Sequence, residues 1–118
     1  MAGGLAALPG ETKGDFELST QRTASGHTAP GQGWQNYNNA GIFIDVDTSS
    51  AGFTGNPTYV ISLGGDGTHW SAVGASAVYS PTRTRFRVYL QWKDTRVLTP
   101  AHAAQYNFHI NWIGIDEP

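Results

Sequence analysis

The amino-acid sequence predicts an all-β fold, an antiparallel β-sandwich of six to seven short strands. Several segments alternate apolar and polar residues, which is the period of a strand with one buried face, and no segment sustains a helical period. The chain also contains 15 Gly, 6 Pro, 4 Trp, 5 Tyr and 5 Phe, a composition that suits tight turns around a thin aromatic core. Its 118 residues are therefore expected to form one domain with a single core.

The expected elements can be placed in chain order. Residues 1–14 have neither a charged start nor a long apolar run and are expected to form a flexible leader, so the domain is assigned to residues 15–118. Alternation and β-branched residues predict strands at residues 15–20, 41–48, 58–63, 71–79, 84–92 and 106–115. Turn-forming residues predict loops at 21–33 and 49–57, and one helical turn is expected at 100–105.

The strand at residues 84–92 has the clearest pattern, because one of its faces is apolar and the other is basic, aromatic and polar. The apolar face comprises Thr84, Phe86, Val88, Leu90 and Trp92, and the polar face comprises Arg83, Arg85, Arg87, Tyr89 and Gln91. A strand that is apolar on one side belongs in an antiparallel sheet with that side packed on the core. Arg83 to Arg96 includes five of the seven basic residues, which predicts a local basic patch.

Composition and spacing argue against several classes of function. The formal charge of -2 and the 14% of charged residues do not favour nucleic-acid binding or membrane insertion. The chain has no cysteine, Ser76 lacks the second glycine of a nucleophile elbow, and the glycines at 64–67 lack the lysine of a phosphate-binding loop. The four histidines have no paired-ligand spacing, although one histidine on a trimer axis would be presented three times. We therefore expect no catalytic residue, metal or cofactor.

The remaining pattern is one of recognition. A sugar offers an apolar face and a rim of hydroxyls, so its site needs an aromatic plane beside polar side chains that fix hydroxyl directions. Residues of these types cluster in Trp92, Lys93, Asp94 and Arg96, in Tyr106 and Asn107, and in Asp66, His69 and Trp70. Trp34 and Trp70, in polar loops, are expected to be exposed. The alternation places Trp92 in the core unless a bulge at the strand end turns it outward.

The order of these features resembles the H-type lectin domain family, which includes snail agglutinin and the C-terminal domain of slime-mould discoidins. The resemblance covers about residues 43–115, and its most specific parts are Ser80-Pro81-Thr82 before a strand that closes with Trp92, and the terminal Trp112-Ile113-Gly114-Ile115. It implies a six-stranded sandwich that forms a homotrimer. It also implies a calcium-independent site for galactose or N-acetylgalactosamine between neighbouring subunits.

The resemblance also implies roles for particular residues. Trp92 and Lys93 would meet the sugar, Tyr106 would stack on it, and Ser25 and Gly26 would lie beside an axial hydroxyl. The family's aspartate is missing from this loop, which reads Ser25-Gly26-His27, and residues 71–79 lack the family's arginine. From the residue types, Lys93, Asp94, Arg96 and His27 would hold hydroxyls or acidic groups, and this cationic neighbourhood suggests an acidic sugar.

The sequence therefore predicts a secreted or surface-exposed carbohydrate-binding module that acts in adhesion without chemistry. Two alternatives stay open. One is a trimerising tip or cap of an adhesin or phage tail fibre, with no ligand, in which the arginines of residues 83–87 pair with Asp45 and Asp47. The other is an enzyme acting on polysaccharide.

Overall fold

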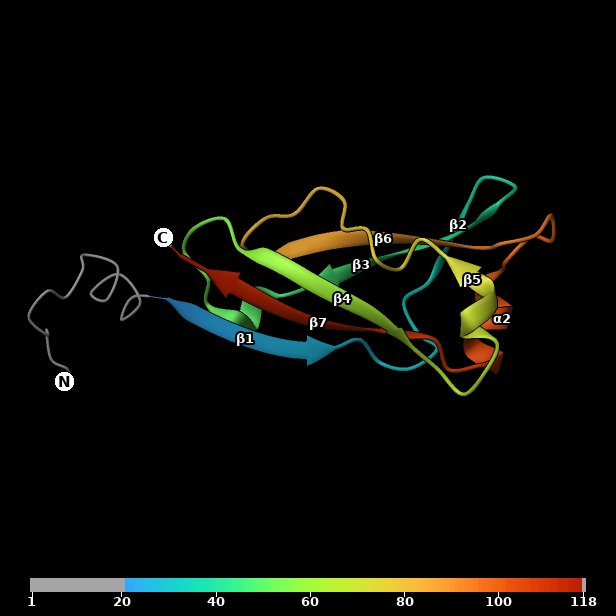
Figure 1. Cartoon of the computed structure of the whole chain (residues 1–118), viewed down its shortest axis with the longest axis horizontal. Coiled ribbons are helices and arrows are strands. Elements are labelled where there is room, and N and C mark those ends of the chain that lie inside the picture. Colours follow the sequence, from blue (N-terminus) through green and yellow to red (C-terminus); the bar gives the residue numbers. More distant parts are fainter. Residues whose placement is uncertain (1–20, 118) are drawn as a thin grey trace, which may run out of the picture.

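The computed structural model describes residues 21–117, which fold into two antiparallel sheets packed face to face (Figure 1). One sheet has three strands in the order β1 (Arg22–His27), β7 (His109–Asp116), β4 (Thr58–Gly64). The other has four strands in the order β2 (Gln35–Tyr37), β3 (Gly41–Asp47), β6 (Arg85–Trp92), β5 (Ala72–Val73). Short helices η1 (Ser49–Ala51), η2 (His69–Ser71) and α2 (Pro100–Gln105) connect them. The predicted all-β sandwich is confirmed.

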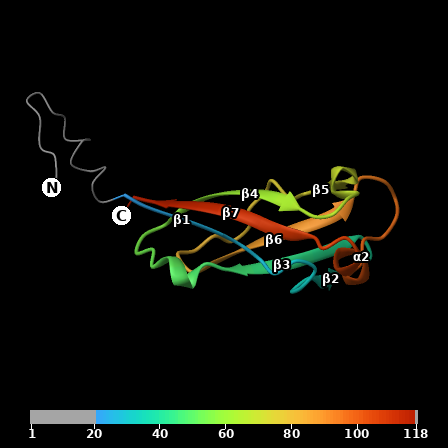
Figure 2. The ribbon, with the colours of Figure 1, turned by 90° about the horizontal axis from the view of Figure 1, so that it is seen from below.

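The core lies between the sheets and is built from the predicted alternation. On β6 the apolar positions Phe86, Val88 and Leu90 are buried, and they pair in register with the buried Val46, Ile44 and Ile42 of β3. Phe108, Ile110, Trp112 and Tyr59 fill the space from the opposite sheet. Figure 2 shows the two layers edge-on, with α2 at one end of the sandwich. The strands predicted at residues 41–48, 58–63, 84–92 and 106–115 are therefore present, with small shifts at their ends.

Helix α2 is the helical turn predicted at residues 100–105, and hydrogen bonds in its first turn hold it in place. The Thr99 side chain accepts a hydrogen bond from the backbone N–H of His102, and His102 Nδ1 accepts one from the backbone N–H of Thr99 at 3.1 Å. This reciprocal cap satisfies two donors that a helix start would leave unpaired, and Pro100 at the first position has no N–H to satisfy. The cap holds Ala103 in the core, next to the buried Phe108.

The residues 21–33, expected to be a loop, instead contain β1, so this prediction was wrong. The inward positions of β1 are Ala24 and Gly26, too small to give an apolar signal in the sequence. They are small because Trp112 occupies the space: a Cβ on Gly26 would press against the indole of Trp112. The strand predicted at residues 15–20 and the leader at 1–14 lie outside the described residues.

Two other expectations need correction. Residues 71–79 were expected to form one strand, but β5 ends at Val73, and the chain returns to the sheet only at the bridge between Tyr79 and Arg87. Gly74 breaks the strand, because its φ of +110° carries the chain away from β6 and a Cβ there would overlap the carbonyl of Tyr89. Trp34 is buried rather than exposed, since its indole N–H donates to the carbonyl of Phe108 at 3.0 Å.

Candidate functional site

The end of the sandwich that carries η2 presents the most exposed large hydrophobic side chain among residues 21–117. Trp70, on η2, is 79% exposed, and Lys93, directly after β6, places its Nζ 4.8 Å from the centre of the indole ring. Their backbones are tied together, because the Lys93 N–H donates to the carbonyl of Ser71 at 2.9 Å. A cation over an indole is a favourable pair even at an exposed site. The arrangement presents an exposed aromatic plane with a hydrogen-bond donor over one of its faces.

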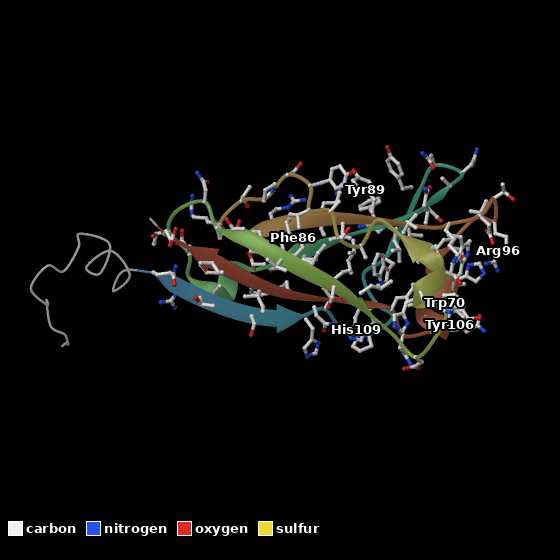
Figure 3. All side chains as sticks on the ribbon, viewed as in Figure 1. Trp70, Phe86, Tyr89, Arg96, Tyr106 and His109 are labelled. Carbon is white, nitrogen blue, oxygen red and sulfur yellow. The ribbon has the colours of Figure 1, made fainter. Side chains whose placement is uncertain are left out.

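The loop between β4 and η2 brings further polar groups to the same end. Asn107 donates from its side-chain amide to Asp66 Oδ2 at 2.7 Å, and the Asp66 N–H donates to the carbonyl of Tyr106 at 2.8 Å. The half-buried Tyr106 stacks on Phe108 with the ring centres 5.9 Å apart. At most one face of the Tyr106 ring is therefore free for a ligand. We call Asp66, Trp70, Lys93, Tyr106 and Asn107 the rim; Figure 3 shows Trp70 and Tyr106 together at this end.

Trp92 is not the exposed platform that the family resemblance implies, and this prediction is corrected. Its side chain is 4% exposed, and its residue pairs with Ala72 of β5, so the alternation of β6 continues to the end without a bulge. The edges of His102 and Phe108 pack against the indole at 5.7 and 6.2 Å between ring centres. The Arg96 guanidinium lies over the ring at 4.9 Å. A sugar cannot stack on Trp92 in this conformation.

Asp94 and Arg96 bind each other rather than standing free. The backbone N–H and the Nε of Arg96 both donate to the Asp94 carboxylate, the latter at 2.9 Å to Oδ2. The hydrogen bond from Arg96 lowers the pKa of the Asp94 carboxyl below its usual value. The pair fixes the turn after β6 and neutralises both charges. Lys93 is left as the cation of this turn that has no carboxylate partner within the described part of the chain.

The predicted site residues of β1 do not join the rim within the chain. Ser25 and His27 lie on the outer face of the three-stranded sheet, and Gly26 faces inward against Trp112. The His27 ring meets the edge of His109, with 6.1 Å between the ring centres. His109 Nδ1 lies 2.9 Å from the carbonyl oxygen of the rim residue Asn107, so His27 approaches the rim through His109.

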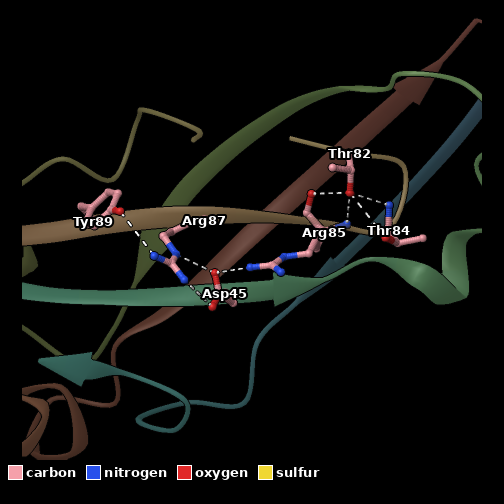
Figure 4. A network of polar contacts seen from close by, with 6 residues as sticks. All are labelled: Asp45, Thr82, Thr84, Arg85, Arg87 and Tyr89. Atoms are coloured by element: carbon pink, nitrogen blue, oxygen red, sulfur yellow. Dashed lines mark hydrogen bonds and ion pairs between the residues drawn. The ribbon is translucent and has the colours of Figure 1, made fainter. Parts of the chain in front are cut away.

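The expected basic patch is partly neutralised on β6, where two of its arginines share one carboxylate of β3 (Figure 4). Arg87 donates to both oxygens of Asp45, at 2.7 and 2.9 Å, and Arg85 reaches the same carboxylate at 3.0 Å. The hydrogen bond from Arg87 lowers the pKa of the Asp45 carboxyl, and the partial burial of that carboxyl opposes the shift. Asp47 does not join these arginines; its side chain accepts from the backbone N–H of Ser49 at 2.9 Å. The shared carboxylate links β6 to β3 and neutralises one of the two guanidinium charges.

Residues 21–117 contain no cluster of three or more His, Asp or Glu side chains placed to hold a metal ion. Over the same range, none of the helices has the length and apolar character needed to cross a membrane. Comparison of the chain with protein-family models and with curated proteins returns no match.

Proposed function

We propose that this chain is a non-catalytic carbohydrate-binding module whose sugar stacks on Trp70. The observation that carries the proposal is the exposure of the Trp70 indole, which is 79% exposed and has Lys93 Nζ 4.8 Å from its ring centre. The short helix η2 that carries Trp70 is bonded to the end of β6 through the backbone of Ser71 and Lys93. Burying an indole releases water from a large apolar surface, so an indole as exposed as that of Trp70 points to a binding partner. Trp70 replaces Trp92, which is in the core.

The chemistry of the rim supports a sugar as that partner. The apolar face of a pyranose ring fits an exposed indole, and its hydroxyls need donors and acceptors in fixed directions around that plane. Lys93 supplies a donor and a positive charge, while Asp66 and Asn107 supply a carboxylate and an amide whose positions are fixed by their mutual hydrogen bond. The unpaired Lys93 favours an acidic sugar, and the resemblance to H-type lectins favours galactose or N-acetylgalactosamine.

A homotrimer is part of the proposal. The outer face of the three-stranded sheet exposes the cross-strand pair Val60 and Ile113, with Ser25 beside it. Exposed aliphatic side chains at the centre of a sheet face favour contact with another copy of the chain. Three weak sites held in parallel gain avidity through effective concentration. Such a module would act in adhesion from a secreted or surface-exposed protein.

The test is a glycan array probed with and without chelator, on protein whose mass is measured by light scattering. We expect a trimer that retains a glycan in the presence of chelator, and loss of that retention in Trp70→Ala. The matched control is Val97→Ala, an exposed apolar residue in the turn after β6. Retention that is identical in Trp70→Ala and the control would remove Trp70 from the site, and product formation would favour an enzyme.

A second candidate, a ligand-free trimerising tip or cap, is favoured by one observation. Arg85 and Arg87 both pair with Asp45 within the chain, so this face of the sheet serves to stabilise the module rather than to attract an anionic ligand. A trimer that retains no glycan in any condition would support this candidate over the lectin.

A further inference from the structure

A second concave surface lies away from the rim, on the outer face of the four-stranded sheet. It is an open groove of about 430 Å³ bounded by the β2–β3 turn on one side and by the chain between Val73 and Tyr79 on the other. Gly74, whose φ is +110°, makes the second wall possible by turning the chain out of β5. The volume is within the range of pockets that hold small ligands, toward its lower end. The groove therefore has room for a short segment of a ligand.

Tyrosine side chains line this groove, which we call the tyrosine groove. Tyr89 of β6 lies at its centre, and the rings of Tyr37 and Tyr79 both meet Tyr89 edge to face with 4.8 Å between ring centres. Tyr37 and Tyr79 are 47% and 48% exposed. Each ring is held by a neighbour on one side and open to solvent on the other. Fixed tyrosines offer a large amphipathic contact at low entropic cost, since few torsions remain to be frozen.

The tyrosine groove carries no charge. Its lining contains tyrosine, asparagine, glutamine, glycine and aliphatic residues, and none of them is ionised at neutral pH. The nearest cation is Arg87, whose guanidinium is held by both oxygens of Asp45 and also donates to the hydroxyl of Tyr89 at 3.5 Å (Figure 4). A phosphate, a nucleotide or a uronic acid would find only this cation, which is already paired with Asp45. A neutral ligand is the complement of this surface.

Apart from the Tyr89 hydroxyl, which accepts from Arg87, the side-chain polar groups of the groove can bind such a ligand. The hydroxyls of Tyr37 and Tyr79 and the amide of Gln91 make no hydrogen bond to any part of the chain between residues 21 and 117. Asn38 accepts from the N–H of Ala40 at 2.7 Å through its carbonyl, which leaves its amide N–H groups to donate. Aromatic planes beside hydroxyl and amide groups, without charge, match the alternating apolar faces and hydroxyls of a sugar chain.

We propose that the tyrosine groove is a second carbohydrate site, selective for a short neutral oligosaccharide. It shares no residue with the rim, so it does not depend on Trp70. Because it is uncharged, its affinity should not change with salt, whereas a sugar held by Lys93 at the rim should bind more weakly as ionic strength rises. The module would then bind glycans at two sites of different chemistry, the charged rim and the neutral tyrosine groove.

The test uses the full chain with 3-fluorotyrosine in place of its five tyrosines, observed by ¹⁹F NMR. Each signal is assigned by a single Tyr→Phe variant, and the probes are cellotriose, maltotriose and chitotriose. We expect at least one probe to shift the signals of Tyr37, Tyr79 and Tyr89, equally at low and high salt. The buried Tyr59 is the internal control, and Tyr106 reports the rim. If no probe moves the three groove signals, or a proline-rich peptide moves them and no sugar does, the proposal is overturned.

A variant quantifies the contact. Tyr79→Ala removes one wall but keeps the backbone bridge to Arg87, so the sheet is expected to remain intact. Loss of one stacked aromatic should weaken the probe that binds about tenfold. The matched control is Val97→Ala, an exposed residue in the turn after β6 that does not line the groove, which should leave the affinity unchanged. Equal affinity in Tyr79→Ala and wild type would refute the site. A shift confined to Tyr106 would also refute it, while leaving the rim proposal standing.

Discussion

The same substitution at two tryptophans should have opposite consequences. Trp92→Ala removes an indole that is 4% exposed and packed against His102 and Phe108, so it leaves a cavity in the core. Trp70→Ala removes an indole that is 79% exposed and contacts little besides Lys93. The first change should destabilise the fold, and the second should affect only what the surface binds.

The magnitudes follow from these environments. Replacing a buried tryptophan by alanine costs about 3–5 kcal/mol, because transfer free energy is lost and the surroundings relax only partly. For a domain near this size each 1 kcal/mol lowers Tm by roughly 4–8 °C, so Trp92→Ala should lower Tm by at least about 12 °C. An exposed substitution changes stability by less than about 0.5 kcal/mol, which is a few degrees at most. A sugar covering about 70 Å² of Trp70 would gain about 1.8 kcal/mol, or roughly 20-fold in affinity.

The assay is urea and thermal denaturation followed by circular dichroism, on both variants and the wild type at one pH. We expect a large loss of stability in Trp92→Ala and a transition close to wild type in Trp70→Ala. Equal transitions in the two variants would refute the assignment of Trp92 to the core. The comparison also matters for binding studies, because lost glycan retention in an unfolded Trp92→Ala protein would say nothing about a site.

The remaining predictions concern the polar groups that hold the fold. The hydrogen bond from Arg87 lowers the pKa of Asp45 below its usual 3.8, so its stabilisation is present above about pH 4 and is lost as the pH falls through the folded value. Asp45→Asn should therefore cost about 1 kcal/mol at pH 7 and less at pH 2 in urea denaturation, and an equal cost at both would contradict this. Asp116 is buried, and its Oδ2 accepts hydrogen bonds from the backbone N–H groups of Thr54 and Gly55. Asp116→Ala should therefore lower the free energy of unfolding by about 2–3 kcal/mol, and Asp116→Asn by clearly less, since the amide keeps an acceptor. Similar losses in the two variants would argue against these hydrogen bonds as the cause. Thr99→Ala should cost about 1 kcal/mol by removing the cap of α2, and an unchanged free energy of unfolding would show that the cap is dispensable.

The fold was predictable wherever bulky apolar residues alternate. β3 and β6 show the period of a half-buried strand in their sequences, and Thr99 followed by Pro100 marks the start of α2. β1 was not predictable, because its inward residues are small. Gly26 has to be small because the indole of Trp112, 86 residues later in the chain, packs against it. The strand expected at residues 71–79 failed because Gly74 turns the chain outward, which composition alone does not reveal.

The candidate site was predictable in part. The polar loop around Trp70 correctly indicated an exposed indole, and the alternation of β6 correctly indicated a buried Trp92, against the role that the family resemblance gave it. The tyrosine groove was not predicted. Tyr37 and Tyr79 flank Tyr89 only because of the register of β3 on β6 and the bridge at Tyr79, and neither of these can be derived from one sequence.

The central claim, that a sugar covers Trp70, can be measured through its fluorescence. Of the four tryptophans, Trp34, Trp92 and Trp112 are buried, so iodide at constant ionic strength should quench mainly Trp70. The account predicts that a glycan retained on the array protects this indole from iodide in proportion to its occupancy. Quenching that is unchanged at saturation with the retained glycan, or an array on which nothing is retained, would contradict it.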